Sequence, residues 1–588
     1  MSVLHTIPEA AAPVYNRGVA SFRRVFRSSE AALILLAVLV GLAAGMLMIV
    51  QNRLAHGMQS LIYGLSGASL SAASAVEPVR LLALPAFGLL LGFGSRAAIR
   101  RWRTPVDVVE ANALHGGAIP WRDSLIVCLQ TLCSNGAGAS VGLEAAYAQA
   151  GGGLASVVGG WLRLRRADMR IMVGAAAGAA IGAAFGAPLA GAFYAFEIVI
   201  GAYTPAAMAP VGAACLSAVL LVRAAGIEPY VVGIPGAKAI TTADYLLYAV
   251  LGIVCAIVSV AVMRAVTWIE AHVRASPIPE TWRPAAGGLL LIPLAMITPQ
   301  VLSAGHGALH LDLGVQVALR FILVVLVVKI AASAISLGFG FRGGLFFASL
   351  FIGSLVGQLF AGAVARIHGV PAIDPSDAAL IGMAAMAVAV VGGPITMSML
   401  VLEITHDFAL TSVAITAALC ASTFVRETFG FSFSTWRLHT RGENIRSARD
   451  VGWMRALTVG KMMQRAPETA PAVTPIGAFR QRFPLGSTAK VVLTDSRGRY
   501  FGIIETARAF DPTLAEDAEI GSQGILREVA LRPSQDVRSA IRMFDLSEAD
   551  YLAVVNDEKI VVGTLSERFV HRRYTNEVEK AQREMFGE

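Results

Sequence analysis

Long apolar segments, many of them interrupted by glycine or proline, constrain this sequence more than any other feature. They follow one another from about residue 31 to residue 424. Several are shorter than the roughly 20 helical residues that are needed to cross a bilayer core. Short, broken helices in a membrane protein are typical of half-helices that end at a site near the bilayer midplane. We therefore predict an all-α, polytopic membrane protein whose functional site lies inside the bilayer.

The composition agrees with this class and excludes others. Hydrophobic residues make up 55% of the 588 residues and charged residues only 15%, which is too apolar for a soluble protein of this size. The formal net charge of +8 does not indicate a nucleic-acid partner, because the basic residues cluster in short loops. Such clusters mark cytoplasmic loops, so we expect the N-terminal lead and the region after residue 437 to be cytoplasmic. The five cysteines show no metal-ligand spacing, and we expect no cofactor.

One carboxylate, Glu144, lies alone in the stretch GAGASVGLEAAYAQAGGG, residues 136–153. An ionisable group at membrane depth is costly and by default marks an ion or substrate path. The preceding glycines suit irregular backbone, and the residues from Ala145 to Val158 can form a helix. Glu144 would then lie at a helix N-terminus, which favours a carboxylate and a mobile anion for the same reason. Two interpretations follow: Glu144 competes with a permeant anion, or it caps a helix that faces the headgroups.

An internal repeat links two apolar runs in which proline precedes glutamate by nine residues. Pro188 precedes Glu197, and Pro394 precedes Glu403. Proline suits the first turn of a helix, where its missing N–H costs nothing. The repeat predicts two homologous halves, about 31–225 and 243–424. The glutamates either take part in function or accept hydrogen bonds from the backbone of broken helices.

The composition changes after Gly442, where charge rises and the long apolar runs stop. Two similar units follow, and each contains two β-runs joined by a polar turn, at Lys490–Ile504 and Tyr551–Leu565. This pattern predicts a hairpin in each unit. We expect the following organisation: a lead at 1–28, a membrane domain at 29–442, a linker at 443–457, and soluble units at 458–513 and 520–580.

Two motifs resemble those of the CLC family of chloride channels and chloride/proton exchangers. They are AFGAPLAG, residues 184–191, and GPITMSMLVLEITHD, residues 393–407. The two C-terminal units resemble a pair of CBS domains. The resemblance covers nearly the whole chain from about residue 30. It implies a two-half inverted repeat with broken helices, a homodimer in the lipid bilayer with one anion pore per subunit, and a small α/β CBS-pair domain.

The resemblance also implies roles for individual residues. Glu144, in GLEAA at 142–146, corresponds to the gating glutamate, which blocks the anion path when ionised and moves away when protonated or displaced. The other implied anion-binding residues are Gly142, Thr104 in place of a serine, Phe346 and Phe347 through their backbone N–H groups, and Ser434 in place of a pore tyrosine. Asp107, near Thr104, would repel an anion unless it pairs with Arg103.

Ile198 departs from the family pattern in a way that bears on mechanism. It stands where the exchangers carry an inner proton-transfer glutamate, and isoleucine cannot carry a proton. This favours channel-like or loosely proton-coupled transport. The alternative is a strict chloride/proton exchanger with a rerouted proton path, in which the adjacent Glu197 or water serves instead.

The CBS pair lacks the aspartate that usually binds ribose. Arg508 and Phe569 stand at the two positions where this aspartate is expected, after Gly502 and Gly563. We therefore expect a structural or dimerising role for the pair and no nucleotide binding.

Transport of small monovalent anions, with chloride as the first candidate, is the function that we predict. A fluoride or nitrate preference stays open because the central serine and tyrosine are both altered. An intramembrane enzyme would need a nucleophile–base pair or metal ligands, and His306, His310 and His406 show no such constellation. A cation transporter would need carboxylate-rich helices, and the apolar segments hold few carboxylates.

Overall fold

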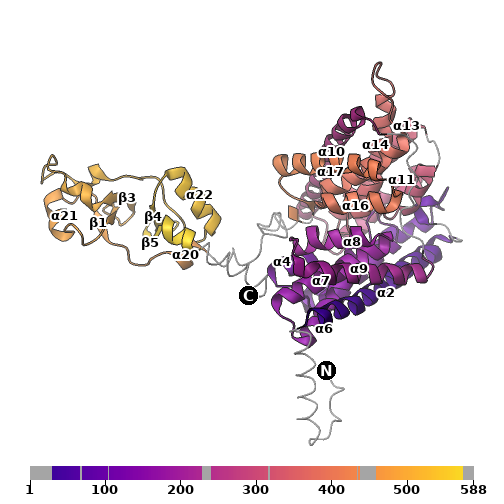
Figure 1. Ribbon diagram of the computed structural model, residues 1–588, viewed down its shortest axis with the longest axis horizontal. Helices are drawn as coiled ribbons and strands as arrows, with labels where there is room; N and C mark the ends of the chain where they lie inside the picture. Colours follow the sequence, from indigo (N-terminus) through magenta and orange to yellow (C-terminus); the bar gives the residue numbers. More distant parts are fainter. Residues whose placement is uncertain are drawn as a thin grey trace, which may run out of the picture. The chain divides into compact units, whose positions relative to one another are not determined.

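The computed structural model describes residues 29–65, 69–102, 105–227, 240–314, 318–433, 435–436 and 458–573. The chain divides into two compact units, Met1–Asp450 and Val451–Glu588. The first unit is helical and the second combines short helices with two small sheets (Figure 1). The proposed lead at 1–28 and linker at 443–457 lie outside the described residues, so the predicted domain boundaries stay predictions.

The first half of the helical unit runs from α2 (Glu30–Tyr63) to α9 (Pro205–Ala224). The elements between them are η1 (Leu70–Ala72), η2 (Arg80–Leu82), α3 (Ala83–Arg101), α4 (Val108–Leu114), α5 (Trp121–Gly136), α6 (Glu144–Leu162), α7 (Arg166–Phe185), α8 (Pro188–Tyr194) and the π-helical η3 (Ala195–Ile200).

The second half runs from α10 (Thr242–Ala275) to α17 (Phe408–Thr428) and repeats the order of the α-helices of the first. The elements between them are α11 (Arg283–Ile297), η4 (Pro299–Val301), α12 (His306–Gly314), α13 (Leu319–Gly338), α14 (Phe346–Val364), α15 (Pro375–Val391) and α16 (Pro394–Thr405). Helices α2 and α10 have 34 residues each, and α6 and α14 have 19 each. The predicted all-α, two-half architecture is therefore confirmed.

Glycine and proline break the helices at equivalent points of the two halves. Helix α7 ends at Gly186 with φ +67°, and Pro188 opens α8 in its first turn. Helix α15 ends at Gly392 with φ +93°, and Pro394 opens α16. A left-handed glycine ends a helix without a Cβ clash, and a proline at the first helical position loses no hydrogen bond. The short helices α8 and α16 therefore follow directly from the sequence.

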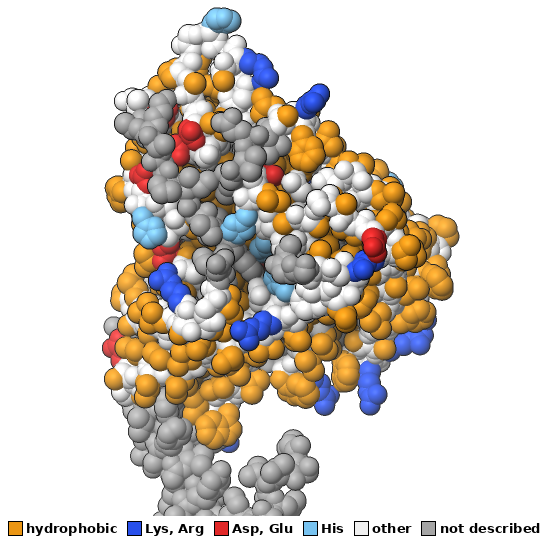
Figure 2. Space-filling view, turned by 90° about the vertical axis from the view of Figure 1, so that its right-hand side faces the viewer, with side chains coloured by type: hydrophobic (Ala, Val, Ile, Leu, Met, Phe, Trp, Pro, Cys, Tyr) orange, Lys and Arg blue, Asp and Glu red, His pale blue; other side chains and the backbone are white. Residues whose placement is uncertain are grey.

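Eight helices of the described residues are long and apolar enough to cross a membrane. Large apolar side chains such as Leu39, Leu61, Leu246 and Trp268 are exposed on them. Figure 2 shows hydrophobic side chains covering the lower right part of one face in a broad band, fringed below by Lys and Arg. Contiguous apolar surface of this extent suits contact with lipid rather than water, as predicted for a polytopic membrane protein.

The C-terminal unit contains two small sheets and several short helices. The first sheet has the order β1 (Thr469–Pro471), β2 (Lys490–Thr494) and β3 (Tyr500–Glu505), and the second pairs β4 (Tyr551–Val555) with β5 (Val561–Ser566). Strands β2–β3 and β4–β5 are antiparallel, so both predicted hairpins are confirmed. The remaining elements are α20 (Val459–Met462), α21 (Ile476–Arg482), η5 (Thr506–Phe510), η6 (Ile520–Gln523) and α22 (Val537–Ser547).

Candidate functional site

Glu144 is the first residue of α6, and its carboxylate folds back over the loop that precedes the helix. A Cβ atom on residue 142 would overlap the Glu144 Oε2 atom, so the carboxylate occupies this place because residue 142 is glycine. The Glu144 side chain is only 3% exposed. Neither of its carboxylate oxygens has a hydrogen-bond partner among the described residues. A buried carboxylate without hydrogen bonds is costly, so Glu144 occupies its position at the expense of stability.

The loops before α6 and α14 pair with each other through equivalent residues. The Gly142 N–H donates to the Gly344 carbonyl at 3.0 Å, and the Gly344 N–H donates to the Gly142 carbonyl at 3.3 Å. Each glycine lies two residues before the first residue of its helix. A reciprocal contact between equivalent residues indicates a local two-fold relation between the halves. The pairing brings the N-termini of α6 and α14 together.

A cavity of about 150 Å³ lies where the N-termini of α4, α6 and α14 converge. The first N–H groups of a helix lack intrahelical acceptors, and the helix dipole adds positive potential, so this arrangement suits an anion. The polar and aromatic side chains on the cavity walls are Asp107, Glu110, Thr131, Glu144, Tyr194, Arg342, Phe346 and Phe433. The cavity therefore combines helix N-termini and one guanidinium group with three carboxyl groups.

The remaining predicted anion-binding residues are placed as follows. Thr104 and Ser434 lie outside the described residues. Gly142 supplies space for the glutamate, and its N–H is engaged by Gly344. Phe346 lines the cavity, and Phe347, which is fully buried, follows it in the first turn of α14. Direct anion binding by these residues stays a prediction.

Asp107 lies at the start of α4 and is tied to its own helix. Its Oδ1 atom accepts a hydrogen bond from the Val109 N–H at 2.9 Å, as an N-cap residue does. The sequence raised Asp107 as a source of repulsion for an anion, and the structure places it on the cavity wall. Its suggested partner Arg103 lies outside the described residues.

Sequence reasoning did not single out Tyr194. This residue lines the cavity from α8, and its ring centroid lies 6.2 Å from that of Phe346, edge to face. Its position inside a uniformly apolar run gave no signal that would separate it from the core. Phe433 is buried and lines the same cavity.

Glu197 and Glu403 cap helices of the opposite halves. Glu197 accepts hydrogen bonds from the Ile395 and Thr396 N–H groups at 3.2 and 2.8 Å and from the Thr396 hydroxyl at 2.7 Å, all at the start of α16. Glu403 accepts two backbone hydrogen bonds of 2.8 Å at the start of α8. This geometry matches the structural alternative for both residues. A proton path through Glu197 stays a prediction.

His306 lies beside the glutamate, from a helix in the other half of the chain. Its Nε2 atom is 3.8 Å from Glu144 Oε1, and its ring centroid is 3.8 Å from that of Phe347. Sequence reasoning found no constellation of ligands or nucleophile around His306, His310 and His406. The contact of His306 with Glu144 joins α12 to α6, and no local pattern encodes it.

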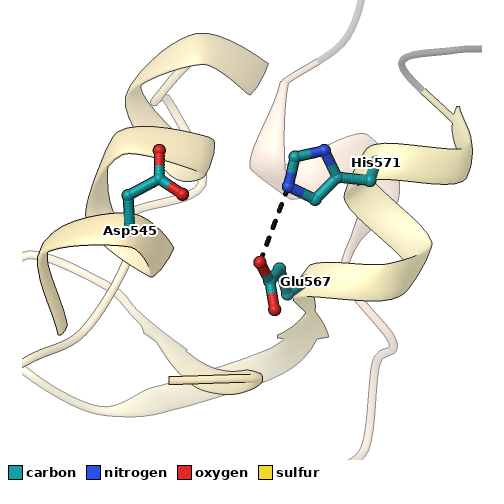
Figure 3. Close-up of side chains that lie close together, drawn as sticks. All are labelled: Asp545, Glu567 and His571. Carbon is teal, nitrogen blue, oxygen red and sulfur yellow. Dashed lines mark ion pairs between the residues drawn. The ribbon is translucent and has the colours of Figure 1, made fainter. Parts of the chain in front are cut away.

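Figure 3 shows a second group of titratable side chains, in the C-terminal unit: Asp545, Glu567 and His571. Their potential ligand atoms lie within 4.8 Å of one another. The His571 Nε2 and Glu567 Oε1 atoms are 3.6 Å apart, one helical turn along the chain, and both side chains are substantially exposed. An exposed (i, i+4) ion pair with a nearby aspartate explains this group, and we assign no metal to it.

Comparisons with known proteins identify a family and relatives that share this fold. The family model "Voltage gated chloride channel" matches residues 82–426. A putative chloride channel protein ClcB-like from Ralstonia nicotianae is 28% identical over 336 residues, which are 56% of this chain and 78% of that protein.

Two solved structures share the fold. The match to a slow cyanobacterial Cl⁻/H⁺ antiporter covers 70% of this chain and 97% of the antiporter chain, with a TM-score of 0.61 and 21% identity. The match to a eukaryotic CLC transporter covers 93% of this chain and 98% of the transporter chain, with a TM-score of 0.59 and 18% identity. The family model alone spans more than half of the chain, and the chain therefore belongs to the voltage-gated chloride channel family.

Proposed function

We propose that this protein carries small monovalent anions, chloride first, across the membrane and that Glu144 is its gate. The observation that carries the proposal is the buried carboxylate without hydrogen bonds at the cavity where three helix N-termini converge. An anion and an ionised Glu144 compete for the same positive potential. Anion transport itself follows from family membership, whereas the gating role rests on this geometry.

The proposed gating step needs no rearrangement of the helices. Ionised Glu144 occupies the anion path at the cost of burying a carboxylate that accepts no hydrogen bond from the described residues. Protonation removes the charge and with it the attraction to the helix N-termini. A permeant anion then displaces the side chain, and the cavity below Glu144 becomes continuous with the anion path.

For coupling, we propose channel-like or loosely proton-coupled transport. Ile198, Val391 and Phe433 lie on the cavity wall, and none of these three apolar side chains can carry a proton. The second candidate is a strict chloride/proton exchanger with a rerouted path. It draws support from the carboxyl groups of Asp107 and Glu110 on the same cavity and from the antiporter among the solved structures of this fold.

The finer assignments for the rest of the protein are also proposals. The two hairpin units of the C-terminal region form a CBS pair with a structural or dimerising role, and the protein acts as a homodimer with both ends in the cytoplasm. The pair binds no nucleotide, because Arg508 and Phe569 replace the ribose-binding aspartate.

Chloride efflux from proteoliposomes between pH 4.5 and 8 tests the gate. The variants are Glu144→Gln, which cannot ionise, and Glu427→Gln, which changes an exposed glutamate in the last turn of α17. We expect Glu144→Gln to raise the flux at neutral pH severalfold and to remove its pH dependence, while Glu427→Gln behaves as wild type. Unchanged flux and unchanged pH dependence in Glu144→Gln would remove Glu144 from the mechanism.

A further inference from the structure

We propose that His306 is a positioning residue for the gate: its imidazolium form stabilises ionised Glu144 and supplies the proton that opens the path. The inference rests on the proposed gating role of Glu144. It adds a second titratable group, so that proton uptake belongs to the pair and not to the glutamate alone.

The position of His306 is determined by its surroundings. Gly305 turns the chain with φ +102°, and His306 opens α12 directly after it. The Ser71 hydroxyl accepts hydrogen bonds from the next two N–H groups of α12, at 3.0 and 3.3 Å. On its other side the imidazole packs on the Phe347 ring, with an angle of 39° between the planes. The ring is therefore held between a capped helix end and an aromatic side chain.

The distance between His306 and Glu144 suits an ion pair whose proton is poised for transfer. Nε2 and Oε1 are 3.8 Å apart, with side-chain exposures of 11% and 3%. This exceeds hydrogen-bond length, so the Glu144 side chain must rotate toward the imidazole before a proton can pass. An opposite charge at about 4–6 Å typically shifts the pKa of a carboxyl group by about 1–3 units.

The pair connects two cavities. Glu144 lines the large cavity, whereas His306 lines a separate small polar cavity of about 10 Å³ together with His56, Gln59 and Ser303. A volume of this size holds at most about one water molecule. A proton can therefore pass from the polar cavity to the imidazole and from the imidazole to the carboxylate.

Three charged or titratable groups face His306. The positive charges of His56 on α2 and Lys329 on α13 disfavour its imidazolium form, and the carboxylate of Glu144 favours it. The Lys329 ammonium donates hydrogen bonds to the Val301 and Ser303 carbonyls at 3.2 and 2.8 Å, so it is engaged by the backbone.

Two coupled protonation steps follow from this geometry. The first proton resides on His306, and the imidazolium–carboxylate pair keeps Glu144 ionised and the path shut. In the opening step the imidazolium N–H bond breaks and a carboxyl O–H bond forms, so the proton moves from Nε2 to Oε1. The neutral imidazole then takes a second proton from the polar cavity.

His306→Gln tests the inference, because glutamine matches histidine in size and carries no charge. Without the imidazolium, Glu144 should take up its proton more easily. The midpoint of the flux–pH profile should therefore move to higher pH by about one unit or more. His306→Asn provides the same test should the glutamine variant fail to assemble. His310→Gln, an exposed histidine on the same helix, is the matched control and should leave the midpoint unchanged.

A double variant separates the proton role from packing on Phe347. Glu144→Gln/His306→Gln should have the same pH-independent flux as Glu144→Gln. An unchanged midpoint in His306→Gln and His306→Asn would overturn the inference. So would a change in flux on His306→Gln substitution that is equally large with glutamate and with glutamine at position 144. Retained pH dependence in Glu144→Gln alone would instead overturn the proposed gating role.

Discussion

The Glu144 carboxylate can fold back over its loop only because residue 142 has no side chain. A Cβ atom there would meet Oε2 and the carboxyl carbon, the second at 2.9 Å. The equivalent residue of the other half, Gly344, has open space instead, with its nearest contacts at 3.7 Å. Neither glycine has a φ in the left-handed region. The two positions therefore differ in one respect, namely whether an added methyl group displaces the proposed gate.

Gly142→Ala should open the anion path without touching the glutamate. The methyl group forces the carboxylate out of its position, so we expect flux at neutral pH to rise toward that of Glu144→Gln. Gly344→Ala should keep wild-type flux, because its methyl group makes ordinary contacts. Chloride efflux from proteoliposomes measures both. Equal flux in Gly142→Ala and Gly344→Ala would contradict the placement of the carboxylate over residue 142.

At this scale the sequence indicated the proposed gate but not all of its neighbours. Glu144 was recognisable because a single carboxylate among small, apolar residues is rare at membrane depth. His306 was not, because its contact with Glu144 depends on how α12 meets α6. The same holds for Tyr194, which lines the cavity from α8 beside residues of α4, α6 and α14 that are distant in sequence.

The crossed caps of α8 and α16 join the two halves of the membrane unit. Glu197→Ala removes the acceptor of three hydrogen bonds at the start of α16. Hydrogen bonds to a charged group are worth about 1.5–3 kcal/mol each in folded proteins. We expect Glu197→Ala to lower the thermal unfolding midpoint in detergent clearly, and Glu197→Gln, which keeps one acceptor oxygen, to lower it less. Lost proton dependence of transport at an unchanged unfolding midpoint would instead make Glu197 a proton carrier.

The two hairpins of the C-terminal unit carry matched turns that differ in charge. Asp495 Oδ1 accepts hydrogen bonds from the Arg497 and Arg499 N–H groups, both at 2.8 Å. Asn556 Oδ1 accepts two backbone hydrogen bonds in the same way before β5. The backbone hydrogen bond from Arg499 lowers the pKa of Asp495 below its usual range, with further contributions from Arg497 and both guanidinium charges.

The backbone hydrogen bonds that Asp495 accepts should therefore weaken in acid, whereas those accepted by the uncharged Asn556 should not. A lowered folded-state pKa means that Asp495 stabilises the hairpin above the unfolded value of about 3.9, and that this contribution is lost as pH falls through the folded-state pKa. Asp495→Ala should speed amide exchange in β2–β3 relative to wild type at pH 7, and the difference should vanish in acid. Strands β4–β5 serve as the internal control. A difference that persists unchanged in acid would exclude the charge of Asp495 as the cause.

Local sequence patterns predicted the helices and hairpins. They did not predict the contacts between residues that are distant in the sequence. The helix expected at Ala145–Val158 is α6, which runs on to Leu162 and ends where Arg163 adopts a left-handed conformation with φ +54°. Proline and glycine positions predicted the broken helices, and alternation predicted the hairpins. The pairing of Gly142 with Gly344 could not be read from either loop, because each loop alone is only a short glycine-rich segment.

At the scale of the whole molecule, the question is whether protons and anions move together. A coupled exchanger needs a proton carrier on each side of Glu144 and gates that never open together. The proposed His306 pair supplies a carrier on the side of the small polar cavity. On the side of the large cavity, Ile198 cannot carry a proton and Glu197 is engaged as a helix cap, which leaves Asp107 and Glu110 as the carboxyl groups of a rerouted path. We therefore expect protons to reach Glu144 from the small polar cavity, whereas the anion path crosses the whole membrane unit.

The zero-current potential of the reconstituted protein measures this coupling directly. A tenfold proton gradient is worth about 1.4 kcal/mol, and a unit charge crossing a membrane gains about 2.3 kcal/mol per 100 mV. A strict exchanger must therefore shift its zero-current potential by tens of millivolts when a gradient of one pH unit is imposed at constant chloride. We expect a shift of a few millivolts at most, although the size of the current should change as the gate titrates.

Glu144→Gln is the control, because it cannot exchange protons and should show no shift. Proton movement against its gradient, driven by chloride alone, would identify a strict exchanger and leave Asp107 and Glu110 as the first residues to test for a rerouted path.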